Sequence, residues 1–331
     1  MPFPHFDPVL IHLGPLSIRW YAMAYIAGIL LGWRYGVALS RNAKLWGGTR
    51  PTLDERQIDD LVLWLTLAIL IGGRVGYVLF YNTEVIWKDP LEILQPWHGG
   101  MSFHGAFIAV SLVIIWFSIK SLGIPALRSL GLVFTPWKPE ARRGLAQALR
   151  IADLTAPCAP FGLLFGRIAN FINGELWGRP TTVPWGIIFP NAGPEPRHPS
   201  ELYEAGLEGI GLFVILRIAT HHLKWLPRRG ANTGLFFLFY GLFRIALENV
   251  REPDRNMPNF PLGLTMGMML SIPMVLIGVW LLWLSRRPDA LAPPMAEDLA
   301  LDPSLNPTPA DVPEVAADPF ASSDYADESQ H

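Results

Sequence analysis

The sequence predicts an all-α polytopic membrane protein with seven transmembrane helices, an N-terminus on the outer (periplasmic) side of the membrane and a cytoplasmic C-terminus. Composition is the first reason, because 51% of the 331 residues are hydrophobic and 16% are charged, whereas roughly a quarter of the residues in a soluble domain are charged. The second reason is a series of apolar stretches close to the ~20 residues that a helix needs to cross a bilayer. A large soluble enzyme is therefore not expected.

Seven apolar stretches are the candidates for these helices. The fourth, fifth and sixth are weaker than the others because they contain charged residues and prolines. In chain order, the predicted spans are Trp20–Leu39, Leu61–Tyr81, Phe103–Leu122, Leu154–Ile172, Tyr203–Ile218, Gly234–Val250 and Leu262–Leu284. With their connections they form the first predicted domain, residues 1–287.

The orientation follows from the basic residues in the connections between spans. The stretches after the first, third, fifth and seventh spans are rich in Lys and Arg, and the intervening ones are poor. Because cytoplasmic loops carry the excess of positive charge, this alternation predicts an N-terminus outside. The residues concerned are Arg41, Lys44, Arg50, Arg56, Arg128, Lys138, Arg142, Arg143, Arg150, Lys224, Arg228, Arg229, Arg286 and Arg287.

Residues 288–331 form the second predicted domain. This segment holds ten of the 28 acidic residues, none of the 26 Lys and Arg residues, and eight prolines. Such a segment has too few apolar groups to build a core. It is predicted to be a disordered, acidic, Pro-rich cytoplasmic tail.

No cofactor and no metal are expected. The single cysteine, Cys158, excludes a disulfide framework, a thiolate zinc site and an iron–sulfur cluster. The histidines show no HxxxH or HExxH spacing. No nucleic-acid partner is expected either.

Ionisable residues inside the predicted spans are the main indication of a functional site. Each costs about 2.5 to 3.5 kcal/mol in a spanning helix, so each needs a partner or a route to water. Those in the outer halves of the spans are Arg74, Arg167, Glu204, Glu208, Arg244 and Glu248, and Tyr21 and His104 begin spans at the same level. Polar groups at one depth on several helices predict a site that opens to the outer side.

The sixth span carries a polar stripe, Tyr240, Arg244, Glu248 and Arg251, whose spacings of 4, 4 and 3 place it on one helical face. Two interpretations stay open at this point. The stripe either belongs to the functional site or only holds helices together by polar contacts.

Three further motifs carry chemistry. The run from Gly166 to Arg179 combines two arginines, two asparagines and a glutamate among glycines, and this composition favours an anionic head group because Arg donates two parallel hydrogen bonds to phosphate. His104 is a candidate proton acceptor near neutral pH, and Gly105 is expected to leave its flank open. His198 begins the motif before the fifth span, where Ser200 and Glu204 are expected to be helix caps.

Taken together, six motifs in this order resemble those of bacterial prolipoprotein diacylglyceryl transferases. They are Trp20-Tyr21, Gly73-Arg74 with Tyr77, Gly99 to Gly105, Gly166 to Arg179, His198 to Glu204, and Tyr240 to Arg251. The resemblance covers the chain from about Phe6 to Leu284. It implies a multi-pass enzyme of the bacterial inner membrane whose active site lies toward the periplasmic side.

The family resemblance also implies a reaction and its partners. The diacylglyceryl group of phosphatidylglycerol moves to the thiol of the lipobox cysteine of a prolipoprotein, and glycerol phosphate is released; membrane lipids surround the enzyme. By position, the implied essential histidine is His104 and the implied phosphate-handling arginines are Arg167 and Arg244. The other implied positions are Tyr21, Asn170, Glu175, Gly178 and Glu248, and the expected substrate-binding set also includes Arg74, His198, Tyr240 and Arg251.

For this reaction a positioned base is needed, since a free thiol has a pKa near 8.5 and is only slightly ionised at neutral pH. His104 is the expected base, and Tyr21 is expected to orient it or the lipid. The rival hypothesis is a transporter or flippase for lipids or small anions that uses the same polar cluster as a binding site, although no internal repeat is visible. An intramembrane protease is a weaker rival, because no Ser-His or paired-Asp arrangement occurs in the outer cluster.

Overall fold

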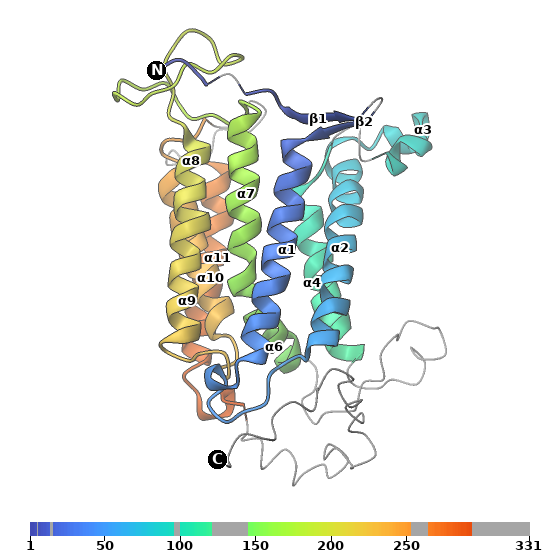
Figure 1. Ribbon diagram of the computed structural model, residues 1–331, viewed down its shortest axis with the longest axis vertical. Helices are drawn as coiled ribbons and strands as arrows, with labels where there is room; N and C mark the ends of the chain where they lie inside the picture. Colours follow the sequence, from blue (N-terminus) through green and yellow to red (C-terminus); the bar gives the residue numbers. More distant parts are fainter. Residues whose placement is uncertain (5, 14–15, 96–99, 121–144, 253–263, 293–331) are drawn as a thin grey trace, which may run out of the picture. The chain divides into compact units, whose positions relative to one another are not determined.

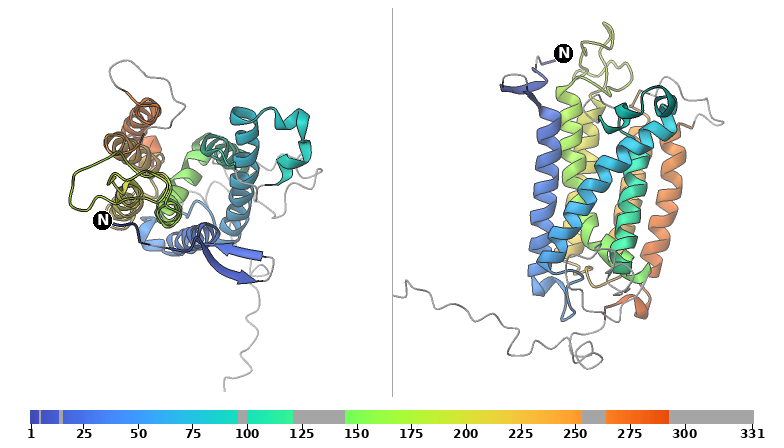
Figure 2. Two further views of the ribbon diagram at one scale, coloured as in Figure 1. Left: turned by 90° about the horizontal axis from the view of Figure 1, so that it is seen from above. Right: turned by 90° about the vertical axis from the view of Figure 1, so that its right-hand side faces the viewer.

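Long helices make up most of the structure and stand side by side (Figures 1 and 2). The computed structural model describes residues 1–4, 6–13, 16–95, 100–120, 145–252 and 264–292. These described residues all belong to one unit, Met1–Ala292. The predicted tail beyond residue 292, the loop of residues 121–144 and the start of the seventh predicted span lie outside the described residues.

Helices occupy all the predicted spans. They are α1 (Trp20–Arg41), α2 (Glu55–Tyr81), α4 (Phe103–Lys120), α6 (Leu145–Thr155) with α7 (Ala159–Ile172), α8 (Ser200–Glu204) with α9 (Leu212–His221), α10 (Ala231–Leu247) and α11 (Met266–Leu284). Among the described residues, four stretches are long and apolar enough to cross a membrane, namely Trp20–Arg41, Glu55–Leu79, Ala146–Ile172 and Met266–Leu284, and His104–Ser118 and Ala231–Leu247 are shorter apolar helices. The chain is therefore a helical membrane protein.

Three of the predicted spans differ from the helices that the structure shows. The fourth span is divided by a 3-10 turn at Ala156–Cys158, where Pro157 cannot donate a main-chain hydrogen bond. The fifth contains a π-helical segment, Ala205–Gly211, between α8 and α9. The sixth ends at Leu247, so Arg251 lies beyond the helix.

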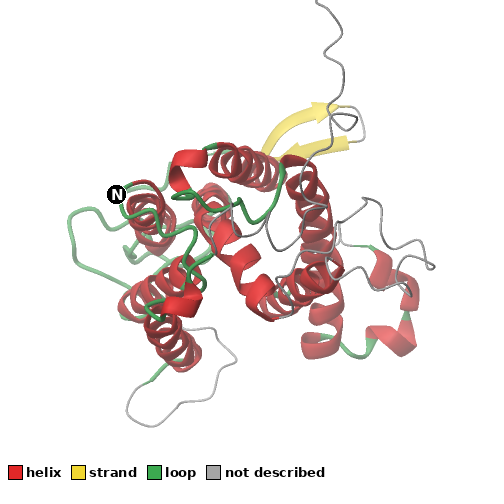
Figure 3. Cartoon of the chain, turned by 90° about the horizontal axis from the view of Figure 1, so that it is seen from below, coloured by secondary structure: helices red, strands yellow, loops and turns green. Residues whose placement is uncertain are grey.

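A short antiparallel hairpin precedes α1 and is the exception to the all-α prediction among the described residues (Figure 3). Its strands are β1 (Val9–Leu13) and β2 (Leu16–Arg19). The β-branched residues of this segment favour an extended backbone. The hairpin lies at the same end of the helices as the small helix α3 (Val85–Lys88) (Figure 1).

Glycines set the distance between neighbouring helices. A Cβ on Gly105 of α4 would lie 2.2 Å from the Gly72 oxygen and 2.6 Å from the Gly76 Cα of α2. Gly28 of α1 faces Gly162 of α7 at 2.9 Å in the same way. Small residues allow such close backbone approach, which favours helix association in lipid. Gly105 thus serves helix packing, and the expectation that it leaves the flank of His104 open stays a prediction.

The described unit ends at Ala292, slightly past the predicted domain boundary at residue 287. A 3-10 turn at Pro288–Ala290 follows α11. The Ala292 nitrogen donates to the Pro227 oxygen at 3.0 Å, and the Arg229 nitrogen donates to the Ala290 oxygen at 2.9 Å. These main-chain bonds tie the segment to the α9–α10 connection.

Substitution of Gly105 by Ala is expected to destabilise the protein by about 1 to 3 kcal/mol, because the new methyl group meets the rigid backbone of α2. The measurement is thermal unfolding in detergent. Gly162→Ala is the matched control, since a Cβ there meets nothing within 4 Å and Ala is the better helix former. Equal unfolding temperatures for Gly105→Ala and wild type would contradict the packing argument.

Candidate active site

Three arginines and three glutamates form a continuous ion network between α7, α10 and the fifth helical segment, which consists of α8, the π-helical segment Ala205–Gly211 and α9. Glu204 is its centre: its carboxylate forms ion pairs with all three arginines and accepts hydrogen bonds from Arg244 and Arg251. The Glu204 Oε2 atom lies 2.9 Å from Arg167 Nε, and Oε1 lies 2.9 Å from Arg244 Nη1 and 2.8 Å from Arg251 Nη1. The Glu208 Oε2 atom lies 3.4 Å from Arg167 Nη2, and Glu248 Oε1 lies 2.7 Å from Arg244 Nη2.

Close helix packing brings these residues together. A Cβ on Gly209 of the π-helical segment would lie 2.8 Å from the Leu164 Cβ of α7, so only a glycine allows the two backbones to approach there. This approach places Arg167, three residues further along α7, against Glu204 and Glu208. π-Helical segments occur frequently at functional sites.

The carboxylates of the network lie deeper than the guanidiniums. The Glu204 and Glu208 side chains are fully buried, whereas the side chains of Arg167, Arg244 and Arg251 are 18%, 16% and 12% exposed. Three positive groups are thus balanced by three negative groups, but the accessible surface of the network belongs to the positive ones. The network therefore favours an anion on its open side.

The end of α10 is tied to α11 by Glu248. The Thr265 hydroxyl donates to Glu248 Oε2 at 2.7 Å and also caps α11 by accepting from the Met268 nitrogen at 3.2 Å. A Cβ on Gly267 would lie 2.2 Å from Glu248 Oε1. The orientation of Glu248, and with it that of Arg244, thus depends on the start of α11.

The loop between α7 and α8, residues 173–199, covers the end of the helices at which the ion network lies (Figure 1). The Asn170 side-chain amide donates to Glu175 Oε1 at 2.9 Å, and that of Asn173 donates to the same atom at 3.3 Å. The Gly178 nitrogen donates to the His198 oxygen at 2.8 Å, and a Cβ on Gly178 would lie 2.4 Å from the Val250 oxygen. Gly178 thus acts through close backbone packing of the loop on the end of α10.

Leu176 in this loop adopts a left-handed backbone conformation, with φ of 63°. This conformation costs an L-residue other than glycine roughly 1 to 2 kcal/mol. The Leu176 oxygen accepts from the Ser200 hydroxyl at 3.0 Å, while its side chain is 40% exposed.

His198 has a structural partner in the same region. Its Nδ1 atom lies 3.3 Å from the Tyr203 hydroxyl, which also accepts from Trp185 Nε1 at 2.6 Å. Partial burial lowers the pKa of His198 below its ordinary value. A neutral imidazole that accepts from Tyr203 fits this arrangement.

Tyr21 and Tyr240 lie on different helices, α1 and α10. The contact of Gly28 with Gly162 and that of Gly32 with Cys158 show that α1 runs antiparallel to α7, which places the start of α1 level with Arg167. The Tyr21 ring packs on Tyr25 at 5.2 Å between centroids. The Tyr240 ring is buried and stacks on Phe236 at 5.7 Å.

Arg74 and His104 lie on α2 and α4 rather than on the helices that form the network. The Arg74 guanidinium is buried and donates to the main-chain oxygens of Ile93, Gly100 and Glu92. It thus holds the connection between α2 and α4. His104 is the second residue of α4, and its side chain is exposed.

Glu204 and Glu208 are the network residues that the expected site omits. The expectation that Ser200 and Glu204 cap the fifth helix is wrong, because Pro199 occupies the cap position without a side-chain bond, Ser200 binds Leu176, and Glu204 binds three arginines. The sequence signal that could have identified them is the spacing of four residues between Glu204 and Glu208 in an apolar span, which places both carboxylates on one helical face.

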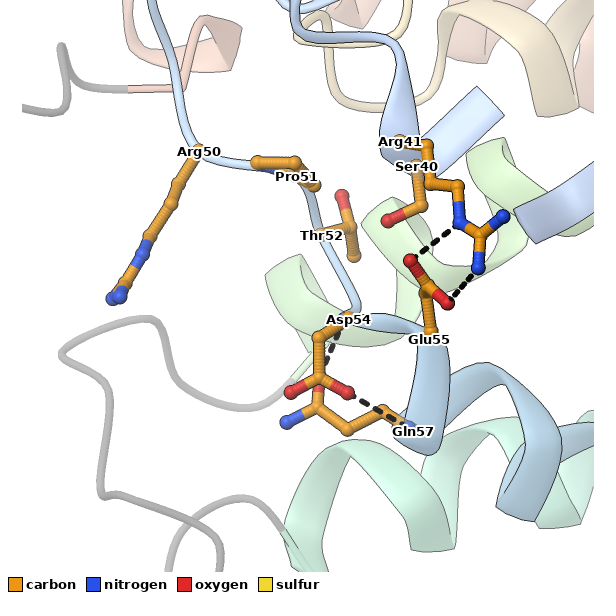
Figure 4. Close-up of a pocket in the computed structure, with 8 residues that line it drawn as sticks. All are labelled: Ser40, Arg41, Arg50, Pro51, Thr52, Asp54, Glu55 and Gln57. Atoms are coloured by element: carbon orange, nitrogen blue, oxygen red, sulfur yellow. Dashed lines mark hydrogen bonds and ion pairs between the residues drawn. The ribbon is translucent and has the colours of Figure 1, made fainter. Parts of the chain in front are cut away.

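A pocket of about 280 Å³ lies elsewhere in the molecule, at the turn between α1 and α2 (Figure 4). It is lined by Ser40, Arg41, Arg50, Pro51, Thr52, Asp54, Glu55 and Gln57. Arg41 ends α1, whereas Tyr21 lies in its first turn, so this pocket lies at the end opposite the ion network. Its exposed pair Arg41–Glu55 and the capping box of Asp54 and Gln57 suit a helix start. Within the described part of the chain, no group of three His, Cys, Asp or Glu side chains could hold a metal.

Comparison with known proteins identifies the family. The family model for prolipoprotein diacylglyceryl transferase matches residues 8–284. The phosphatidylglycerol–prolipoprotein diacylglyceryl transferase of Phenylobacterium zucineum is 55% identical over 88% of this chain and 98% of its own length. The proteins with the same name from Caulobacter sp. strain K31 and Rhodopseudomonas palustris are 52% and 47% identical, over 90% and 89% of this chain and 99% and 95% of their own lengths. The chain therefore belongs to the prolipoprotein diacylglyceryl transferase family.

Proposed function

We propose that the ion network holds the phosphate of phosphatidylglycerol while the diacylglyceryl group moves to the cysteine thiol of a prolipoprotein. The transferase activity is that of the relatives named above. The observation that carries the site proposal is the layered arrangement of charge, with buried carboxylates behind partly exposed guanidiniums.

Arginine geometry supports phosphate binding at the network. A guanidinium has five N–H donors, and the two ion pairs of Arg244 leave further hydrogens on Nη1 and Nη2 for a ligand. Arg167 is likewise held by two carboxylates. Fixed donors aimed at the site of developing charge need no reorganisation during the reaction, and one such donor contributes about 3 to 4 kcal/mol by analogy with oxyanion sites. Arg167 and Arg244 thus stabilise the departing phosphate, and Arg251 completes the cationic surface.

The transfer step forms a carbon–sulfur bond and breaks the bond between the glycerol carbon and the phosphate oxygen. Glycerol phosphate leaves with the electron pair, and the thiol proton passes to a base. We assign this base to His104 and assign Tyr21 to the orientation of the base or the lipid. Cys158 is not the nucleophile, because it follows α6 and packs against Gly32 and Gly36 of α1, toward the end opposite the network.

Asn170, Glu175 and Gly178 shape the head-group side of the site through the loop contacts described above. Tyr240 lines the network from α10, and Glu248 holds Arg244. Arg74 and His198 support the site from a distance, through the α2–α4 connection and the loop. The contacts described above support these roles.

Seven membrane crossings fit the helices and the distribution of basic residues. In this arrangement the N-terminus and the ion network face the periplasm, and the C-terminus lies in the cytoplasm of a bacterial cell whose inner membrane holds the enzyme. The positive-inside pattern supports the orientation. The relatives are named as transferases, and no comparable observation favours the transporter hypothesis.

The purified protein, given labelled phosphatidylglycerol and a lipobox peptide, is expected to produce lipidated peptide and glycerol phosphate. In sealed right-side-out inner-membrane vesicles, peptide added outside should be modified, because the site opens to the periplasmic side. Mass spectrometry of the peptide provides the measurement. Movement of lipid across the membrane without formation of lipidated peptide would favour the transporter hypothesis. Modification only of peptide enclosed in the vesicles would show that the site faces the cytoplasm instead.

Replacement of His104 by Gln is expected to lower kcat by about 10² to 10⁴, because a positioned base contributes that much to proton transfer. The KM for phosphatidylglycerol should change little, since the arginines bind the phosphate. Steady-state transfer rates are the measurement, and His222→Gln, at an exposed position after α9, is the control. Near-normal kcat in His104→Gln would remove the base role from this residue.

Loss of charge at Glu204 is expected to lower kcat/KM by about 10² or more, because three guanidiniums lose their common partner and breaking one buried pair costs about 3 to 5 kcal/mol. Glu204→Gln is compared with Glu252→Gln, which removes a half-exposed carboxylate paired with Arg197. Transfer rates and thermal unfolding are measured together. Wild-type rates in Glu204→Gln would show that the network does not position the arginines.

A further inference from the structure

Leu176 combines two unfavourable features that its surroundings do not explain. Its backbone has φ of 63°, a conformation that glycine or asparagine adopts more easily than leucine. Its side chain is apolar and 40% exposed. The strained backbone therefore does not serve to bury the leucine, and residues that suit the backbone better would leave no apolar group on the surface.

The conformation is held by bonds on both sides of Leu176. The Ser200 hydroxyl, fully buried at the start of α8, donates to the Leu176 oxygen at 3.0 Å. The Glu175 nitrogen donates to the Asn170 oxygen at 3.1 Å, and the Gly178 nitrogen donates to the His198 oxygen at 2.8 Å. Backbone strain that surrounding bonds maintain in this way is concentrated at active sites and ligand contacts.

The next residue shows that the loop has an inward and an outward side. The Trp177 ring packs on Phe189 at 6.0 Å between centroids, in a cluster of buried aromatic residues. Leu176 precedes it and stays partly exposed. The loop thus partly buries the side chain of Trp177 and leaves that of Leu176 more exposed.

Position decides which substrate Leu176 can reach. The residue lies beyond Ile172, where α7 ends, and its oxygen is bound to the first residue of α8, four residues before Glu204. It therefore lies beside the ion network but past the end of the apolar helices. Acyl chains belong at the level of the apolar helices, whereas a peptide that brings a thiol to the head group must pass the level of Leu176.

We propose that Leu176 contacts an apolar residue of the substrate peptide next to its cysteine and so contributes to recognition of the peptide, an inference that rests on the proposed transferase function. The contact holds the thiol near the arginines, and the left-handed backbone directs the leucine to the peptide. Leu176 is thus a specificity-determining residue for the protein substrate, separate from the residues that bind phosphate.

The test is Leu176→Asn, which suits the backbone but replaces the apolar side chain with a polar one. The KM for a lipobox peptide is expected to rise about fivefold, because only the exposed 40% of the leucine is available for new burial. The KM for phosphatidylglycerol and kcat should stay near wild type. Leu176→Met, which keeps an apolar side chain, should restore the peptide KM.

Lys224 provides the matched control, because it is the other described non-glycine residue with positive φ, at 53°, and it lies beyond α9. Lys224→Asn should leave both KM values unchanged. Thermal unfolding checks that the variants fold, and Leu176→Gly, which also accepts the backbone, replaces the Asn variant if that variant does not fold.

An unchanged peptide KM in Leu176→Asn, or an equal rise in Leu176→Met, would overturn the proposal. A rise in the phosphatidylglycerol KM alone would also overturn it, because lipid rather than peptide would then contact the leucine. Failure of the proposed function is distinguishable from all of these outcomes, since it would appear as absence of transfer by the wild-type protein.

Discussion

Neutralisation of charge within apolar helices is the constraint on which the rest of this structure depends. Three arginines and three glutamates lie among helices that otherwise carry almost entirely apolar side chains, and an ionised group left unpaired in such surroundings is costly. Glu204 meets this need by forming ion pairs with Arg167, Arg244 and Arg251 at once. The positions of α7, the fifth helical segment and α10 are therefore linked through a single carboxylate.

This constraint also supports the proposal that the site binds an anion. Because the carboxylates are buried behind the guanidiniums, the network is neutral as a whole but presents positive charge where a ligand can approach. Burial strengthens these interactions, since the effective dielectric inside the protein is far below that of water. A phosphate that reaches the open side would meet donors already fixed in place, which is the arrangement that stabilises a charged leaving group.

Glycines make this network possible without themselves carrying chemistry. Gly209 lets the π-helical segment approach Leu164, and Gly178 lets the covering loop pack on the Val250 oxygen. The first contact brings Arg167 of α7 against Glu204 and Glu208. Close backbone approach at a glycine also sets the distance between α2 and α4, where Gly105 contacts the backbone of α2. Two different needs, close packing in lipid and precise placement of charges, are thus met by the same residue type.

The sequence by itself determined that the chain is a helical membrane protein, where its helices run and which family it belongs to, because hydrophobicity over about 20 residues and short ordered motifs are local properties. It also identified Arg167, Arg244 and Glu248 as candidate site residues, because a charged residue within an apolar stretch can be recognised from the sequence alone. It did not identify Glu204 as the common partner of three arginines, nor the strained backbone of Leu176. Those depend on helices far apart in the chain meeting at a given depth, on a π-helical turn and on a left-handed backbone held by Ser200, and only the packed tertiary structure decides such contacts.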